Sequence, residues 1–106
     1  MFTLTQKQAI AIFSGKDPWA KKQVIRQDAI VHQTDIEIDG VPVAVVVFVA
    51  GKCGSDPIYN VGVGFVADGE YHERVKHLGG QQNLQRAIAS CEKLAGNTDD
   101  ILLMFA

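Results

Sequence analysis

The sequence predicts an α+β fold: a small antiparallel sheet, made of a four-strand meander plus a C-terminal strand, with one amphipathic helix packed on it and two short N-terminal helices. Residues 41–50 contain no charged side chain and are rich in valine, which is typical of a central strand covered on both faces. Asp39-Gly40, just before this run, is a strong signal for a tight β-hairpin turn. Between residues 84 and 95, apolar side chains recur at helical spacing, which predicts a helix that covers the sheet.

Length and composition indicate one globular domain over residues 1–106. Of these residues, 47% are hydrophobic and 21% are charged, a balance that argues against disorder. The formal net charge of −2 gives no global reason to bind nucleic acid. No signal-peptide pattern opens the chain, and Cys53 and Cys91 form neither a disulfide framework nor a Cys-x-x-Cys motif. We therefore expect a cytoplasmic protein that does not contact the membrane.

Two short helices are predicted before the sheet. Residues 5–8 form a capping-box pattern, and the helix that follows is expected to end before Gly15. Asp17 and Pro18 then favour the start of a second helix, expected to continue to about Arg26.

The predicted hairpin sets the register of the first two strands. A two-residue turn at Asp39-Gly40 places one set of cross-strand pairs on the face toward the core: Ile38 with Val41, Ile36 with Val43, Thr34 with Val45, His32 with Val47 and Ile30 with Val49. The other set lies on the opposite face: Glu37 with Pro42, Asp35 with Ala44, Gln33 with Val46 and Val31 with Phe48.

The third strand is predicted over residues 58–67, with alternating faces. One face carries Tyr59, Val61, Val63 and Phe65, and the other carries Asn60, Gly62, Gly64 and Val66. Glycines inside a strand indicate that another segment approaches the backbone closely. A three-residue loop at 68–70 then leads to a fourth strand over 71–78, with Tyr71 and Val75 in the core. A two-residue turn would instead bury His72, Arg74 and Lys76, which is costly. A short helix over 71–78 is the alternative.

A helix is predicted from residue 81 to about residue 94. Its apolar stripe comprises Leu84, Ala87, Ile88, Cys91, Leu94 and Ala95. Gly96-Asn97 ends this helix, and residues 101–105 are expected to form the fifth strand, apolar on both sides.

The sequence offers no recognisable catalytic constellation. His32 is interpreted as a hydrogen-bonded structural residue on the core face of the sheet, and Cys91 as a small core residue. His72 and His77 project to opposite faces of a regular strand, so they cannot share one metal ion. Cys53 lies in a loop without a histidine partner in the sequence. We expect no catalytic group, no metal site and no cofactor.

The sheet face opposite the helix is the strongest candidate for a binding surface. One flank is acidic, the centre is apolar and the other flank is basic, a pattern that favours protein recognition over nucleic acid. The candidate partner-binding residues are Asp35, Glu37, Phe48, Asn60, His72, Arg74 and Lys76. In the alternative interpretation, the N-terminal helices cover this face and its centre is ordinary core.

These observations favour a small non-catalytic binding or inhibitory protein whose partner is another protein or a second copy of itself. Accessory, immunity and counter-defence proteins of bacteria and phages are analogous in size and type. One alternative is a nucleic-acid-binding module that uses a basic helix at 16–26, with Lys16, Lys21, Lys22 and Arg26. Another is a small-ligand-binding or enzyme domain, which a pocket lined by Trp19, His32 or Tyr59 would favour.

Overall fold

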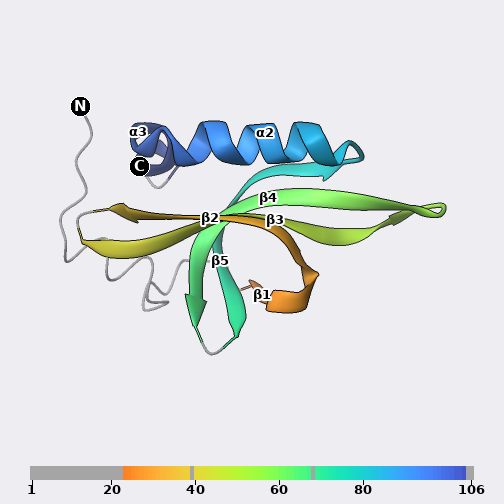
Figure 1. Cartoon of the computed structure of the whole chain (residues 1–106), viewed down its shortest axis with the longest axis horizontal. Helices are drawn as coiled ribbons and strands as arrows, with labels where there is room; N and C mark the ends of the chain where they lie inside the picture. The colour runs from red at the N-terminus through yellow and green to blue at the C-terminus, as the bar shows by residue number, and fades with distance from the viewer. Residues whose placement is uncertain (1–22, 39, 68, 105–106) are drawn as a thin grey trace.

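The computed structural model describes residues 23–38, 40–67 and 69–104. Its elements, in chain order, are β1 (Gln23–Arg26), the 3-10 turn η1 (Gln27–Ala29), β2 (Ile30–Ile38), β3 (Val41–Cys53), β4 (Asp56–Ala67), β5 (Glu70–Gln81), α2 (Leu84–Ala95) and α3 (Thr98–Leu103). The five strands form one antiparallel sheet in the order β1-β5-β4-β3-β2, with α2 packed along it (Figure 1). No helix in the described ranges has both the length and the apolar character needed to cross a membrane.

The β2–β3 hairpin has the predicted register over most of its length. Ile38 pairs with Val41, and the pairing continues as predicted to His32 and Val47, with Gly40 at a φ of 80° in the turn. Such a positive φ favours glycine because it has no Cβ. Beyond His32 the register shifts, so that Ile30 pairs with Phe48 instead of Val49. The bulge turns Ile30 onto the opposite face of the sheet from the one predicted.

The fourth strand of the meander is β5, which confirms the strand over the helical alternative for residues 71–78. The predicted three-residue loop is wrong, because Ala67 pairs with Glu70 across a two-residue turn. Three register irregularities between β4 and β5 then change which face each side chain occupies. As a result Tyr71 and Val75, expected together in one core, lie in two different hydrophobic clusters.

The fifth strand of the sheet is β1, whereas residues 101–105 were expected to supply it. Val24 and Ile25 of β1 pair with His72 and Tyr71, so the helix predicted to reach Arg26 is wrong over residues 23–26. The remainder of the two predicted N-terminal helices lies outside the described residues.

The last described element of the chain is the helix α3, where a strand was predicted. The side chain of Asn97 accepts a hydrogen bond from the backbone N–H of Asp100, which caps the first turn. Asp99 and Asp100 in that turn add favourable negative charge near the helix N-terminus. Ile101 and Leu102 are buried, so the apolar run packs against the core as a helix.

A hydrophobic cluster packs against each face of the sheet. Between the sheet and α2 lies the first, which includes the predicted stripe of α2 and Val43, Val45, Val47, Val61 and Val63. The second lies on the opposite face and comprises Ala44, Val46, Phe48 and Tyr71, with Ile25, Ile30 and Val66 packed against them.

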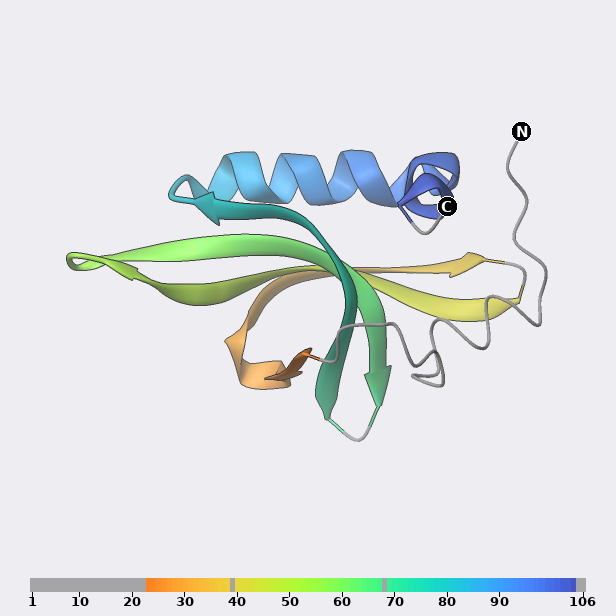
Figure 2. The same cartoon turned by 180° about the vertical axis from the view of Figure 1, so that it is seen from behind.

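The sheet curls around the second cluster. β1 and β2 are its two opposite edges, yet only Gln27–Ala29 separate them in the chain, so the edges must come close at this corner. Figures 1 and 2 show β1 and the turn end of β4 and β5 bending away from α2. The face opposite α2 is therefore the inside of a strongly curved sheet.

Candidate functional site

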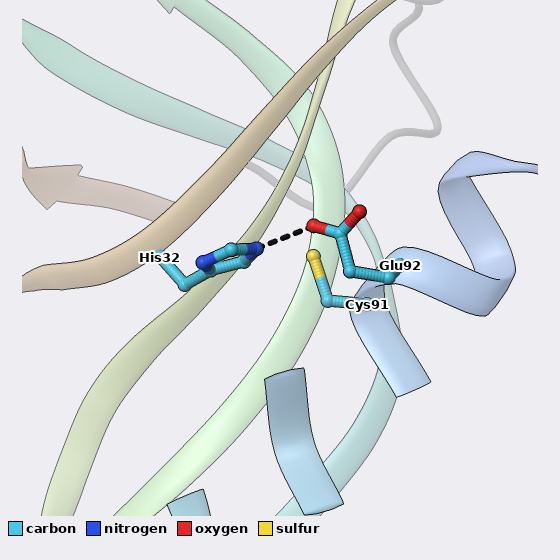
Figure 3. Close-up of side chains that lie close together, drawn as sticks. All are labelled: His32, Cys91 and Glu92. Atoms are coloured by element: carbon cyan, nitrogen blue, oxygen red, sulfur yellow. Dashed lines mark hydrogen bonds and ion pairs between the residues drawn. The ribbon is translucent and has the colours of Figure 1, made fainter. Parts of the chain in front are cut away.

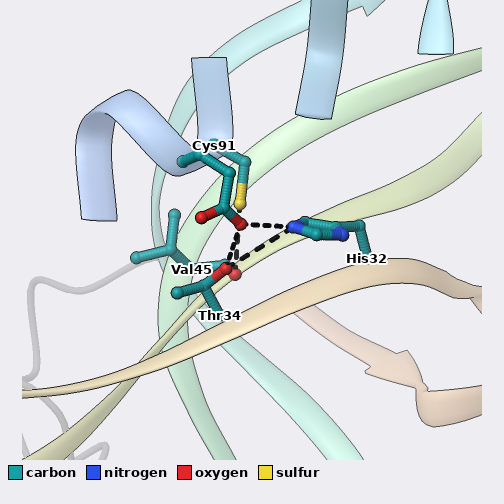
Figure 4. A network of polar contacts seen from close by, with 5 residues as sticks. His32, Thr34, Val45 and Cys91 are labelled. Carbon is teal, nitrogen blue, oxygen red and sulfur yellow. Dashed lines mark hydrogen bonds and ion pairs between the residues drawn. The ribbon is translucent and has the colours of Figure 1, made fainter. Parts of the chain in front are cut away.

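Polar side chains from the edge strand β2 and from α2 meet beside the sheet (Figure 3). His32 Nε2 lies 2.5 Å from Glu92 Oε1, and the hydroxyl of Thr34 donates a hydrogen bond to the same oxygen. Cys91, the residue before Glu92 on α2, donates its S–H to the carbonyl oxygen of Val45 at 3.4 Å (Figure 4). The period of β2 brings His32 and Thr34 to this face, and the helix stripe brings Cys91.

The environment shifts the pKa of two of these groups in opposite directions. Hydrogen bonds from Thr34 and then from His32 lower the pKa of the Glu92 carboxyl. Burial raises the pKa of the Cys91 thiol to about 11, with a smaller contribution from the charge of Glu92. A thiol with a raised pKa stays protonated near neutral pH, so Cys91 is a poor nucleophile here.

The ligand atoms of His32, Cys91 and Glu92 all lie within 4.8 Å of one another. Within the described ranges this is the one group of three histidine, cysteine or acidic side chains close enough to hold a metal ion. The sequence pattern correctly predicts His32 and Cys91 on facing sides of the sheet and helix, but it does not show that they meet. The sequence signal for this cluster was the placement of His32 on the core face of the sheet and of Cys91 on the apolar stripe of the helix.

The predicted partner surface is not continuous in the structure. Phe48 is 1% exposed and Arg74 is 7% exposed, so the expectation that both are accessible to a partner is wrong. The curl of the sheet explains this, since Phe48 belongs to the second hydrophobic cluster, with its ring centroid 6.0 Å from that of Tyr71. Asp35, which pairs with Ala44 of this cluster, remains exposed.

The basic flank is partly built into the fold. The guanidinium of Arg74 lies 5.0 Å from the centroid of the Phe65 ring, and His72 stacks on the same ring at 4.7 Å. His72 is half-buried, and Asn60, also half-buried, accepts a hydrogen bond from the backbone N–H of Gly80 at 3.1 Å. Lys76 is exposed. Of the seven predicted partner-binding residues, Asp35, Glu37 and Lys76 are those that face solvent openly.

Comparisons with known proteins found no match to this chain among protein-family models, curated proteins or solved structures. A function therefore has to rest on the side chains and surfaces of this chain.

Of the four residues named for the alternative nucleic-acid site, the structure describes Arg26. Arg26 lies in β1, and its guanidinium is 3.6 Å from the carboxylate of Asp28, with both side chains highly exposed. Lys16, Lys21 and Lys22 lie outside the described residues. The basic helix proposed for 16–26 is wrong at its C-terminal end, since residues 23–26 are extended.

A hollow of about 370 Å³ lies beside β2 and β3, mainly on the face opposite α2. The described residues that line it are Gln33, Asp35, Pro42, Val43, Ala44, Phe65 and Val66. Neither His32 nor Tyr59 lines it, and Trp19 lies outside the described residues.

The outer edge of β2 borders this hollow, because Gln33 and Asp35 of β2 line it. Within the described part of the chain, β2 pairs with β3 alone. Asp35 and Glu37 are exposed along it, and the amide of Gln33 donates a hydrogen bond to Asp35 Oδ1 at 2.7 Å. The edge thus combines a row of peptide groups, two carboxylates and a neighbouring hollow.

Proposed function

We propose that this is a non-catalytic binding protein that docks an extended, positively charged segment of another protein along β2. The observation that carries the proposal is the acidic outer edge of β2, which lies beside the hollow. Such docking would make the sheet one strand wider, a mode of recognition in which the backbone supplies affinity and side chains supply specificity.

The backbone of β2 supports strand addition. In an antiparallel edge strand, alternate residues turn their N–H and C=O groups away from the neighbouring strand. Those groups form a template for pairing with another chain. Over Ile30–Ile38 the edge is long enough to pair with several residues of an extended segment.

The charges of β2 indicate the chemistry of the segment. Asp35 and Glu37 are two residues apart and so lie on the same face of the strand, opposite α2. Lysine or arginine side chains at alternate positions of a docked strand would lie across from them. Each such opposite-charge pair contributes about 0.2–1 kcal/mol. The hollow beside Asp35 lies on this same face, so it would take the apolar stem of one of those lysine or arginine side chains.

An inhibitory action and a cytoplasmic location belong to the same proposal. A protein that blocks its partner by occupying a surface needs a binding edge and no catalytic group. Both Cys53 and Cys91 are free thiols, which supports a reducing compartment.

The test measures binding of a labelled extended peptide in which lysine alternates with valine or threonine. An otherwise identical peptide with glutamate at each lysine position is the comparison. We expect the full-length protein to bind the basic peptide and not the acidic one. Reversing Asp35 and Glu37 together to lysine should weaken binding by about tenfold or more, equivalent to about 1.4 kcal/mol.

The matched control is Asp56→Lys with Glu70→Lys, which makes the same change in net charge at two exposed positions, one at the start of β4 and one at the start of β5. We expect this control to bind like the unmodified protein. Equal losses in both double variants, equal affinity for the two peptides, or no binding of the basic peptide would each contradict the proposal.

A further inference from the structure

We propose that His32, Cys91 and Glu92 form a binding site for a divalent cation of the Zn²⁺ type, at the junction of β2 and α2. The site lies on the opposite side of β2 from Asp35 and Glu37, because strand residues alternate between faces. The inference does not depend on peptide docking, and either proposal can fail without the other.

The donor set selects the class of metal. The three residues offer an imidazole nitrogen, a sulfur and a carboxylate oxygen. Zn²⁺ binds all three kinds of ligand, whereas Mg²⁺ and Ca²⁺ prefer oxygen alone. Three protein ligands leave the fourth tetrahedral position to a water molecule or another ligand.

The distances allow coordination with small side-chain movements. Metal–ligand bonds of about 2.0–2.3 Å place tetrahedral ligand atoms about 3.3–3.8 Å apart. His32 Nε2 and Glu92 Oε1 are now 2.5 Å apart, a hydrogen-bonding distance, so they must separate when an ion enters between them. Their side chains are 30% and 51% exposed, which leaves room for that movement. Cys91 is fully buried, so its sulfur is the fixed point of the site.

Neighbouring groups suit the bound state as well. The Thr34 hydroxyl already holds the Glu92 carboxylate from β2 and makes Thr34 a positioning residue. Coordination converts the Cys91 thiol to a thiolate: the S–H bond breaks, the proton passes to solvent and the sulfur electron pair binds the ion. The hydrogen bond to the carbonyl of Val45 is then given up.

The experiment titrates the reduced full-length protein with Co²⁺, followed by Zn²⁺. A thiolate bound to Co²⁺ gives a charge-transfer absorption in the near ultraviolet, and we expect this band to saturate at one ion per chain and to disappear when Zn²⁺ displaces Co²⁺. Cys91→Ser should abolish the band. Thr34→Val, which removes only the positioning hydroxyl, should weaken binding about tenfold.

The matched control is Cys53→Ser, which removes the other cysteine, an exposed one. It should keep both the band and the affinity. Because Cys91 is buried, its variant is first checked for folding by circular dichroism. His32→Gln and Glu92→Gln change partly exposed side chains, and we expect both to fold and to lose most of the affinity. The proposal is overturned if the folded unmodified protein gives no band, if Cys53→Ser removes it, or if both glutamine variants bind normally.

Discussion

Replacing Gly64 with alanine is expected to destabilise the fold strongly, because the new methyl group would meet the backbone of the next strand. A Cβ at this position would lie 2.0 Å from the carbonyl oxygen of His72 and 3.0 Å from the Cα of Glu73. Both atoms belong to the backbone of β5, so relief requires β4 and β5 to move apart. Overpacking of this kind typically costs about 1–3 kcal/mol, and more where the backbone must shift.

Chemical denaturation measures this effect, and Gly51→Ala is its control. Gly51 also lies in the sheet, but a Cβ there meets nothing within 4 Å. We expect Gly51→Ala to be neutral or to stabilise the protein by up to about 1 kcal/mol, because alanine restricts the unfolded chain. Equal free energies of unfolding for the two variants would show that β4 and β5 do not approach each other as described.

Replacing Phe48 with alanine is expected to destabilise the protein by about 3–5 kcal/mol, the usual cost of removing a buried aromatic ring. Phe48 is 1% exposed and packs with Tyr71 inside the curled sheet. For a domain of this length, such a loss lowers the thermal midpoint by roughly 10 °C or more. Thermal unfolding followed by circular dichroism gives the measurement.

Val49→Ala is the matched control for this change. Val49 is the next residue of the same strand, and it is 37% exposed. We expect its midpoint to fall much less. If Phe48→Ala left the midpoint unchanged and instead weakened association, Phe48 would belong to an interface, as the sequence alone suggested.

The parts of the fold that could be predicted depend on short-range patterns. The two-residue turn at Asp39-Gly40 and the strict alternation around it determine the register from His32 to Val47. The spacing of apolar residues in α2 predicts which side meets the sheet. Gly62 and Gly64 correctly indicated that another segment closely approaches the strand that carries them, β4. The approaching groups belong to β5.

The errors arise where a local pattern has two structural solutions. Residues 101–105 are apolar throughout, so their periodicity cannot separate a buried strand from a short helix. The cap at Asn97 and the two following aspartates were the better signal. Register irregularities between β4 and β5 interrupt the alternation of side chains between the two faces of the sheet. A regular strand pattern therefore could not assign both Tyr71 and Val75 to the correct face.

The candidate site was harder to predict because it depends on long-range geometry. The curl that buries Phe48 follows from β1 and β2 being opposite edges joined by three residues, and β1 was predicted as helix. Likewise, the contact of His32 with Glu92 depends on where α2 crosses β2. The acidic residues Asp35 and Glu37, by contrast, were predicted correctly to lie together on the face opposite the helix.

We propose that the outer edge of β2 is unpaired, and residue-resolved amide hydrogen exchange of the free protein tests this claim most directly. We predict that amides in the middle of β3 and β4 exchange only through global unfolding, because each strand is paired on both sides. Alternate amides between Val31 and Glu37 should exchange orders of magnitude faster, because their N–H groups point away from β3. Uniformly slow exchange along β2 would mean that this edge is already paired in the free protein, and it would contradict the claim.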